Sequence, residues 1–570
     1  MESTKFSINY RKNKRLILEK TNDPVYDPFD ISGIQSFIPL YTRFFDMDDT
    51  NFNKVSLNNT FQIRDLSTVY KNDEIVEKNI FVKFSPLIDP LNFLRGKYNL
   101  ETEITRTLPT ICSTAESCLP KLVDVNNTAY VDGFFSYLTS MLKDTHGWVH
   151  GVEYYGSYLA IQRKFRYNIA DDLEFVSSCP FFLTNINKYF TIDEEAANIL
   201  NQYSGEGSRR NRNKLCIEDG GDVTLDFEDL VDADSCAETS AVETPFLEYE
   251  NTVAKNETVD SPSESESESS GSESESTQSD SDSTDSDSES EGSDDSESVW
   301  ETESESDTGS SSLSEFEDDE EPIFSYLNNY PVQMIFQEKC AGTIDQLILR
   351  RKLNDDQFID ALMQIILILA TYQKVFDFTH NDLHTNNIMY IETDIEFLYY
   401  KLEGILYKVP TNGRIYKLID FGRAIYKFGG KLFCSDSFAA SGDAATQYNC
   451  EPYFNEKKPR VDPNPSFDLS RLGCSLYDFV CRNGEPKTPL QKLVDHWCND
   501  DYGKNMLYRH NGQTRYPDFK LYKMIARTVN NLVPKDELKS LLFSSKYIFK
   551  PEESAADITI MDIDSLPVYM

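Results

Sequence analysis

A long acidic tract divides this chain and limits which parts of it can build a hydrophobic core. Residues 261–320 are almost entirely Ser, Glu and Asp, and they include no Lys or Arg. A segment with so few apolar residues cannot bury enough surface to offset the entropy lost on ordering its chain. We therefore expect residues 204–322 to form a disordered insertion, with folded sequence on both sides.

The same insertion carries most of the charge. The 570 residues have a formal net charge of −41, and roughly 36 of these negative charges fall within residues 217–320. The tract repels nucleic-acid phosphates, so we expect no direct binding of nucleic acid. Three roles remain open: a solvated, flexible insert, a recruitment arm for a basic protein, or a substrate of acidophilic kinases, because many of its serines have Glu or Asp three residues on.

The remaining composition indicates a protein of the cytoplasm or nucleus. The 11 cysteines include no C-x-x-C pair, which is typical of reduced thiols. The first residues lack the apolar stretch of a signal peptide. The longest apolar run, 361–370, is too short to cross a bilayer, so we expect neither secretion nor a membrane segment.

Hydrophobic periodicity predicts a strand-rich part followed by a helix-rich part, which is an α+β organisation. Strands are expected near residues 61–66, 79–84, 151–161 and 332–336, and helices over 130–142, 358–369 and 469–480. Asn354 and Gln357 form a plausible capping pair for the second helix. A β-ribbon is expected over 397–419, with a turn at Asn412–Gly413.

Two short motifs carry the chemistry. The first is His380-Asn-Asp-Leu-His-Thr-Asn-Asn387, and the second is Asp420-Phe-Gly422, which follows an apolar strand. Phosphoryl transfer needs a base that orients a hydroxyl, and oxygen ligands that hold Mg²⁺. Asp382, Asn387 and Asp420 supply these groups, so we expect them to converge beside a bound nucleotide.

These motifs resemble the catalytic loop H-R-D-L-x-x-x-N and the D-F-G of eukaryotic-type protein kinases, with the character of divergent Ser/Thr kinases of large DNA viruses. The resemblance implies ATP and Mg²⁺ as cofactors. It makes Asp382 the catalytic residue, and Asn387 and Asp420 the metal ligands. It also gives Asp468 a structural role, as the buried Asp that braces the catalytic-loop backbone. We expect His380 to be a packed core histidine with a structural role.

Further resemblances concern the nucleotide. Ile80-Phe-Val-Lys83 is similar to the kinase strand V-A-I-K, whose Lys neutralises phosphates. Residues 335–344 resemble the strand and hinge that hold adenine, so backbone groups of Glu338 to Cys340 are expected to bond the base, with Gln337 as gatekeeper.

The implied architecture is a two-lobed kinase-like fold, with a small β-rich N-lobe and a larger helical C-lobe. Its parts are an N-terminal extension (1–54), the first part of the N-lobe (55–203), the acidic insertion (204–322), the last N-lobe strand and hinge (323–340), the C-lobe (341–545) and a C-terminal tail (546–570).

The chain departs from the kinase pattern in three places. No glycine-rich loop precedes Lys83. No obvious Glu pairs with Lys83, and Glu101 and Glu103 are the upstream candidates. Asn381 replaces the Arg that usually binds an activation-segment phosphate, so switching by phosphorylation is less expected there.

His384 replaces the usual catalytic-loop Lys, as in haspin-type protein kinases and in small-molecule phosphotransferases. The ribbon after the loop is similar to an enlarged hairpin of haspin, which favours a protein substrate, with a basic protein as one candidate. The expected function is transfer of phosphoryl groups from ATP to Ser or Thr of a protein. The alternatives are a pseudokinase scaffold that recruits basic partners through its acidic arm, and a small-molecule hydroxyl kinase.

Overall fold

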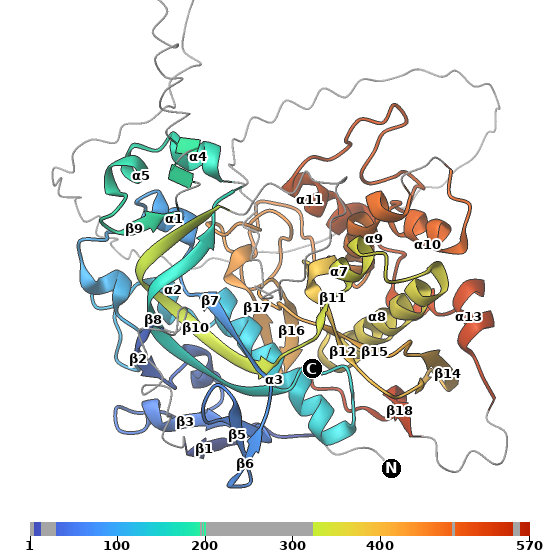
Figure 1. The fold of residues 1–570 in the computed structure, drawn as a ribbon, viewed down its shortest axis with the longest axis horizontal. Helices are drawn as coiled ribbons and strands as arrows, with labels where there is room; N and C mark the ends of the chain where they lie inside the picture. Colours follow the sequence, from blue (N-terminus) through green and yellow to red (C-terminus); the bar gives the residue numbers. More distant parts are fainter. Residues whose placement is uncertain are drawn as a thin grey trace, which may run out of the picture. The chain divides into compact units, whose positions relative to one another are not determined.

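The computed structural model describes residues 5–12, 30–170, 172–193, 196–197, 199–200, 323–481, 485–550 and 559–570 (Figure 1). The predicted acidic insertion over 204–322 lies outside these described residues. The described part mixes strands and helices and belongs to the α+β class. All of it falls within one compact unit, so chain segments on both sides of the insertion fold together.

An antiparallel sheet joins these two parts of the chain. Its strands run in the order β2 (Ile31–Gln35), β8 (Tyr154–Asn168), β10 (Phe324–Glu338) and β7 (Ile80–Pro86), and β9 (Phe190–Ile192) also pairs with β10. The expected strands over 79–84, 151–161 and 332–336 are present as β7, β8 and β10. β10 follows the insertion in sequence but lies between β7 and β8, which precede it (Figure 1).

Helix α3 (Thr128–His146) packs against β8 and β10 of this sheet. It begins where the side chain of Asn127 accepts a hydrogen bond from the amide of Ala129, and it ends at Gly147, whose φ of 69° is the left-handed conformation that glycine adopts at little cost. The side chains from Ala129 to Leu142 are all buried. Helix α3 is therefore enclosed by the fold on all sides over this stretch.

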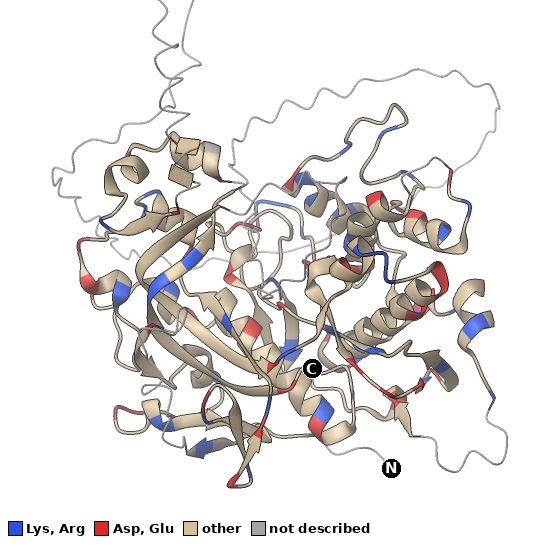
Figure 2. Cartoon of the chain, viewed as in Figure 1, with Lys and Arg blue, Asp and Glu red and all other residues tan. Residues whose placement is uncertain are grey.

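The longest described helix is α8 (Asp355–Phe376), and it starts with the expected capping box between Asn354 and Gln357. It carries no charged residue between Asp360 and Lys374 (Figure 2). It is long and apolar enough to cross a membrane, but 89% of its apolar window is buried inside the fold, as in the central helix of a folded domain. The other helices of this part are α7 (Ile344–Leu349), α9 (Phe467–Val480), α10 (Pro489–Trp497), α11 (Phe519–Thr528), α12 (Pro534–Glu537) and α13 (Leu541–Tyr547).

The predicted β-ribbon is present with a different turn. β13 (Phe397–Leu402) pairs with β14 (Ile405–Pro410) through a turn at Glu403–Gly404. The Asn412–Gly413 turn leads instead into β15 (Arg414–Leu418), which pairs with β12 (Ile388–Glu392). Both turns place their two residues at positive φ, so turn chemistry alone does not reveal which strands pair.

The two chain ends also contribute strands. β1 (Tyr10–Lys12) pairs with β3 (Val55–Leu57), and β18 (Ile560–Asp562) adds a parallel strand to β13. The amide of Phe6 donates to the hydroxyl of Tyr569 at 2.8 Å. Much of the expected N-terminal extension and tail is thus part of the fold, although its strands are too short to show a periodic pattern.

The remaining strands and α-helices are short. They are β4 (Phe61–Ile63), β5 (Thr68–Lys71), β6 (Glu74–Glu77), α1 (Pro90–Leu94), α2 (Pro120–Val123), α4 (Leu173–Ser177), α5 (Pro180–Asn185), β11 (Gly342–Thr343), β16 (Ile425–Phe428) and β17 (Lys431–Cys434).

Candidate active site

Lys83 of β7 lies between two carboxylates that come from distant parts of the chain. Its Nζ is 2.8 Å from Oδ2 of Asp132 in α3 and 2.9 Å from Oδ1 of Asp420, which follows β15. Burial disfavours the charged form of Lys83, but the two carboxylates outweigh burial and raise its pKa above the usual value. Lys83 is therefore a fixed cation at this site.

Asp132 is the partner of Lys83 that sequence reasoning missed. It is 2% exposed, and its Oδ1 also accepts a hydrogen bond from the amide of Phe421 at 2.8 Å. The two expected candidates do not take this place: Glu103 is largely exposed and contacts Arg106, and Glu101 is exposed. The feature that could have identified it is a lone acidic residue inside an apolar helix, because an unpaired charge is costly there.

Asp420 is held in an unusual backbone conformation. Its φ is 60°, which is uncommon for a residue with a Cβ and recurs at functional sites. Burial opposes ionisation of its carboxyl, but the charge of Lys83 and its hydrogen bond outweigh burial and lower the pKa of Asp420. An ionised carboxylate at this point is suited to bind a cation.

The structure places Asp382 and Asn387 in one loop next to Asp420. Nδ2 of Asn387 donates to the backbone oxygen of Asp382 at 2.9 Å and lies 3.1 Å from Nε2 of His384. The amide of Ile419 donates to the backbone oxygen of Asn387 at 3.1 Å, which joins this loop to the segment that carries Asp420. The segments that carry the three predicted groups are thus neighbours in the fold.

The donor set fits Mg²⁺ only in part. Among the described residues, no group of three or more His, Cys, Asp or Glu could hold a metal by itself. Oδ1 of Asn387 accepts no hydrogen bond in the described part of the chain, and Asp420 is an ionised carboxylate. Such a pair suits Mg²⁺, which is usually held by one or two protein oxygens together with substrate phosphates and water.

Asp468 of α9 anchors the same loop from behind. It is fully buried, and its two oxygens accept hydrogen bonds from the amides of His380 and Asn381, each at 2.9 Å. The ring of His380 is also fully buried, and its Nε2 donates to the backbone oxygen of Ile419 at 2.9 Å. Both residues therefore act on the position of the loop backbone.

Asn381 makes neutral contacts where a kinase usually has Arg. Its Oδ1 accepts a hydrogen bond from the hydroxyl of Tyr448 at 2.7 Å, and its Nδ2 donates to the backbone oxygen of Arg423 at 2.9 Å. Arg423 itself contacts Asp443 at 2.6 Å and lies 3.6 Å from Oδ2 of Asp382. Arg423 is thus already paired with a carboxylate of the chain.

The electrostatic setting keeps Asp382 ionised. Burial by itself raises the pKa of this carboxyl, but the charges of Arg423 and Arg471 outweigh burial and lower it below the usual range. Burial also lowers the pKa of His384, which favours its neutral form. A half-buried aspartate that stays ionised can accept a proton from a substrate group.

The expected hinge follows β10. The carboxylate of Glu338 forms an ion pair with the fully buried Lys417 and accepts a hydrogen bond from the amide of Glu153 at 2.8 Å. The amide of Glu338 donates to the backbone oxygen of Glu153, so this N–H is already used. The amides of Lys339 and Ala341 also donate to backbone oxygens, whereas neither backbone group of Cys340 forms a loop hydrogen bond in the described part of the chain. Cys340 is therefore a better candidate than Glu338 to bond a ligand through its backbone.

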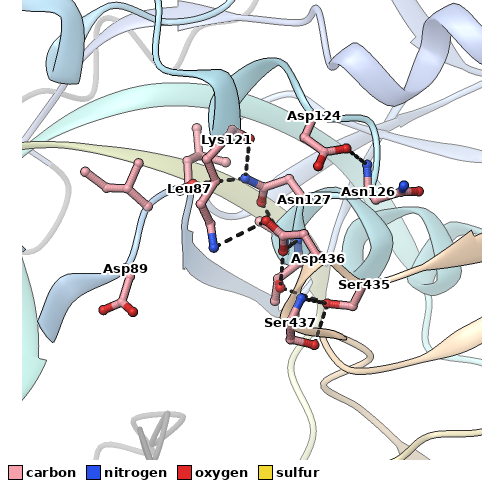
Figure 3. A network of polar contacts seen from close by, with 12 residues as sticks. Leu87, Asp89, Lys121, Asp124, Asn126, Asn127, Ser435, Asp436 and Ser437 are labelled. Atoms are coloured by element: carbon pink, nitrogen blue, oxygen red, sulfur yellow. Dashed lines mark hydrogen bonds and ion pairs between the residues drawn. The ribbon is translucent and has the colours of Figure 1, made fainter. Parts of the chain in front are cut away.

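A polar network ties the start of α3 to the segment after β17 (Figure 3). The carboxylate of Asp436 accepts hydrogen bonds from the amide of Thr128 at 2.9 Å and from its hydroxyl at 2.8 Å, and pairs with Lys121 at 3.3 Å. The side chain of Asn127 donates to the backbone oxygen of Leu87, next to the end of β7. A carboxylate at a helix N-terminus is favourable, so this network fixes the helix that carries Asp132.

The segment upstream of β7 lacks glycine, as the sequence shows, and forms a tight hairpin. β5 and β6 pair through a turn in which Asn72 and Asp73 both have positive φ. Asn and Asp tolerate this conformation better than other residues with a Cβ. A tight turn thus forms without glycine in the segment that precedes the lysine strand in sequence.

Comparison with known proteins links parts of the chain to a kinase and to a viral protein. No protein-family model matches it. It is 30% identical over 109 residues to the serine/threonine-protein kinase haspin of Bos taurus, covering 18% of this chain and 14% of that protein. It is 24% identical over 258 residues to the uncharacterized protein 098R of Invertebrate iridescent virus 6, covering 42% of this chain and 40% of that protein. The chain therefore matches less than half of the length of either relative.

Proposed function

We propose that this protein is a kinase-fold enzyme that transfers the γ-phosphoryl group of ATP to Ser or Thr hydroxyls of a protein. The observation that carries the proposal is the position of Lys83 between Asp132 and Asp420, next to the loop that holds Asp382 and Asn387. Phosphoryl transfer needs this combination of a fixed cation, oxygen ligands for a metal and a base.

The proposal assigns the described elements to two lobes. The antiparallel sheet with α3 corresponds to a small N-lobe, and the helices α7 to α13 correspond to a larger C-lobe. Residues 338–342 connect β10 to α7 and take the place of the hinge. The haspin similarity and the β13–β14 hairpin support this assignment.

Each residue has a distinct role in the proposed reaction. Lys83 neutralises phosphate oxygens and is oriented by Asp132. Asn387 and Asp420 would hold Mg²⁺, and the bound ion would neutralise charge that develops on the phosphates. Asp382 orients the acceptor hydroxyl and accepts its proton, while Asp468 and His380 keep the loop in place. Backbone groups of Cys340 bond the adenine.

The test is transfer of radiolabelled phosphate from ATP with Mg²⁺ to a panel of basic and acidic proteins. We expect Asp382→Asn and Asp420→Asn to reduce transfer by at least about 100-fold, because each removes a group that acts in the transition state. Asp377→Asn is the matched control, since it breaks only an exposed ion pair with Lys427. Undiminished transfer by the two site variants would refute the proposal.

Two alternatives are separated by adding a thermal-shift assay with Mg-ATP and small-molecule acceptors to the same test. Stabilisation by Mg-ATP without any transfer would indicate a nucleotide-binding scaffold, and the hairpin at Asn72–Asp73 without glycine is the feature that favours it. Transfer to amino-sugars or choline but not to proteins would indicate a small-molecule kinase. His384 is the residue that favours this alternative, because small-molecule phosphotransferases also have a histidine there.

A further inference from the structure

Asp382 has a side-chain partner from a helix that the two sequence motifs do not include. The hydroxyl of Tyr522 in α11 donates to Oδ1 of Asp382 at 2.8 Å, across 140 residues of sequence. Tyr522 is 3% exposed, and its ring stacks on Phe519 with centroids 5.5 Å apart. The tyrosine is thus held by packing and points its polar end at the proposed base.

Arg471 of α9 holds the other side of this tyrosine. Its guanidinium carbon lies 4.9 Å from the centre of the tyrosine ring, a cation–π contact. A nearby cation strengthens a phenol as a hydrogen-bond donor. The chain of contacts therefore runs from Arg471 through Tyr522 to Asp382.

The same helix acts on both the backbone and the side chain of the catalytic loop. Asp468 binds the loop amides, and Arg471, one turn later in α9, acts on Asp382 through Tyr522. His384 stands where a lysine usually contacts the base, but its Nε2 faces Asn387. Among the described residues, Tyr522 is the only side chain within hydrogen-bond distance of the Asp382 carboxylate.

We propose that Tyr522, held by Arg471, is a positioning residue for the phosphoryl-transfer reaction. It fixes Oδ1 of Asp382, so that Oδ2 is presented to the acceptor hydroxyl. Oδ2 is 3.6 Å from the Arg423 guanidinium, beyond hydrogen-bond distance, and is free to take a new hydrogen bond. The inference rests on the proposed function, because it gives Tyr522 a role only if Asp382 acts as the base.

The matched pair of variants is Tyr522→Phe and Tyr547→Phe. Each removes only a hydroxyl, and Tyr547 is likewise buried and donates to a buried aspartate, Asp360, at 2.6 Å. We expect Tyr522→Phe to lower kcat about tenfold or more, because it loses a hydrogen bond to a charged group. KM for ATP should stay within about twofold, since the nucleotide does not contact the tyrosine in this scheme. Tyr547→Phe should leave kcat unchanged.

Two further measurements separate positioning from packing. In an Asp382→Asn background, Tyr522→Phe should cause no further loss of the residual rate, because both changes act on one group. Arg471→Gln should lower kcat in the same direction, and combining it with Tyr522→Phe should add little.

The possible failures are distinct. A wild-type protein that shows no Asp382-dependent transfer would overturn the proposed function and this inference together. A wild-type protein that transfers phosphate, with Tyr522→Phe equal to it in kcat, would overturn the inference alone. Equal losses of kcat in Tyr522→Phe and Tyr547→Phe would also overturn it, because they would show a general effect of losing a buried hydroxyl.

Discussion

The carboxylate of Asp132 is shared between Lys83, at 2.8 Å from its Oδ2, and the amide of Phe421, at 2.8 Å from its Oδ1. One side chain of α3 therefore fixes both the lysine of β7 and the segment that presents Asp420. Any movement of α3 would change the relative position of the proposed phosphate ligand and the proposed metal ligand.

The first prediction concerns this shared carboxylate. Asp132→Asn keeps the size of the side chain but removes the charge, so Lys83 pairs with Asp420 alone. We expect phosphoryl transfer to fall by about 10- to 100-fold, because an unrestrained lysine is a poorer clamp for phosphate. Asp132→Ala should also destabilise the fold by about 3–5 kcal/mol, since it leaves a buried charge without one partner. Rate assays and thermal unfolding measure both effects, with the exposed Glu103→Gln as control.

The second prediction concerns the network at the start of α3. Asp436→Ala removes the acceptor of the Thr128 amide and hydroxyl and the partner of Lys121. We expect a loss of about 1–2 kcal/mol in stability, as for loss of a helix N-terminal acceptor. We also expect weaker transfer, because Asp132 lies in the next turn of the helix. Asp124→Asn is the control, since its Oδ1 accepts from the amide of Asn126, before the start of α3.

The contacts of Asp436 also lead to a prediction about how the activity depends on phosphorylation. Because a carboxylate of the chain already holds the start of α3, phosphatase treatment of the purified protein should leave its transfer rate unchanged. A rate that falls after this treatment and recovers on rephosphorylation would contradict this view of Asp436.

The third prediction concerns the buried ion pair behind the hinge. Lys417 is fully buried, donates to the backbone oxygen of Gly151 at 3.0 Å and pairs with Glu338. Lys417→Met leaves the Glu338 carboxylate without its nearest cation, so we expect a loss of about 3–5 kcal/mol in stability and weaker binding of ATP. Adding Glu338→Gln should recover part of both losses, because it removes the unpaired charge. Thermal unfolding and equilibrium nucleotide binding give the two readouts, and a double variant no better than Lys417→Met would argue against the ion pair.

The sequence was informative where the functional groups lie within short motifs, and much less so where they do not. Asp382 and Asn387 are five residues apart, so one loop predicts their proximity. Asp132 lies 49 residues after Lys83, beyond a stretch with no clear period, and Tyr522 lies 140 residues after Asp382. Contacts of this kind depend on how the helices pack against one another. The hydrophobic pattern of a single segment does not encode that packing.

The same limit applies to the strands. The long strands β7, β8 and β10 could be expected from their apolar residues, but their order in the sheet could not. β18 is three residues long and gains its place only through pairing with β13. Short edge strands of this kind follow from the tertiary structure and carry little signal of their own.

The last prediction concerns acid stability through His150, which joins the loop before β8 to two other strands. Its Nδ1 donates to the backbone oxygen of Tyr416 at 2.7 Å, and its Nε2 accepts from the hydroxyl of Tyr400 at 2.7 Å. Burial is the main cause that lowers the pKa of His150 from 6.5 to about 3. The folded protein therefore keeps this ring neutral in a range where the unfolded chain protonates it.

The sign of the effect follows from the number of bound protons. Between the unfolded pKa of 6.5 and the folded value of about 3, the unfolded state binds more protons, so stability is present above this window and is lost as the pH falls through it. The contribution of His150 is at most about 1.4 kcal/mol per pH unit. His150→Gln should flatten the fall of the unfolding temperature between neutral and acidic pH, whereas the exposed His510→Gln should not. An equally steep fall in both variants would show that other buried groups, and not His150, set the acid sensitivity of this fold.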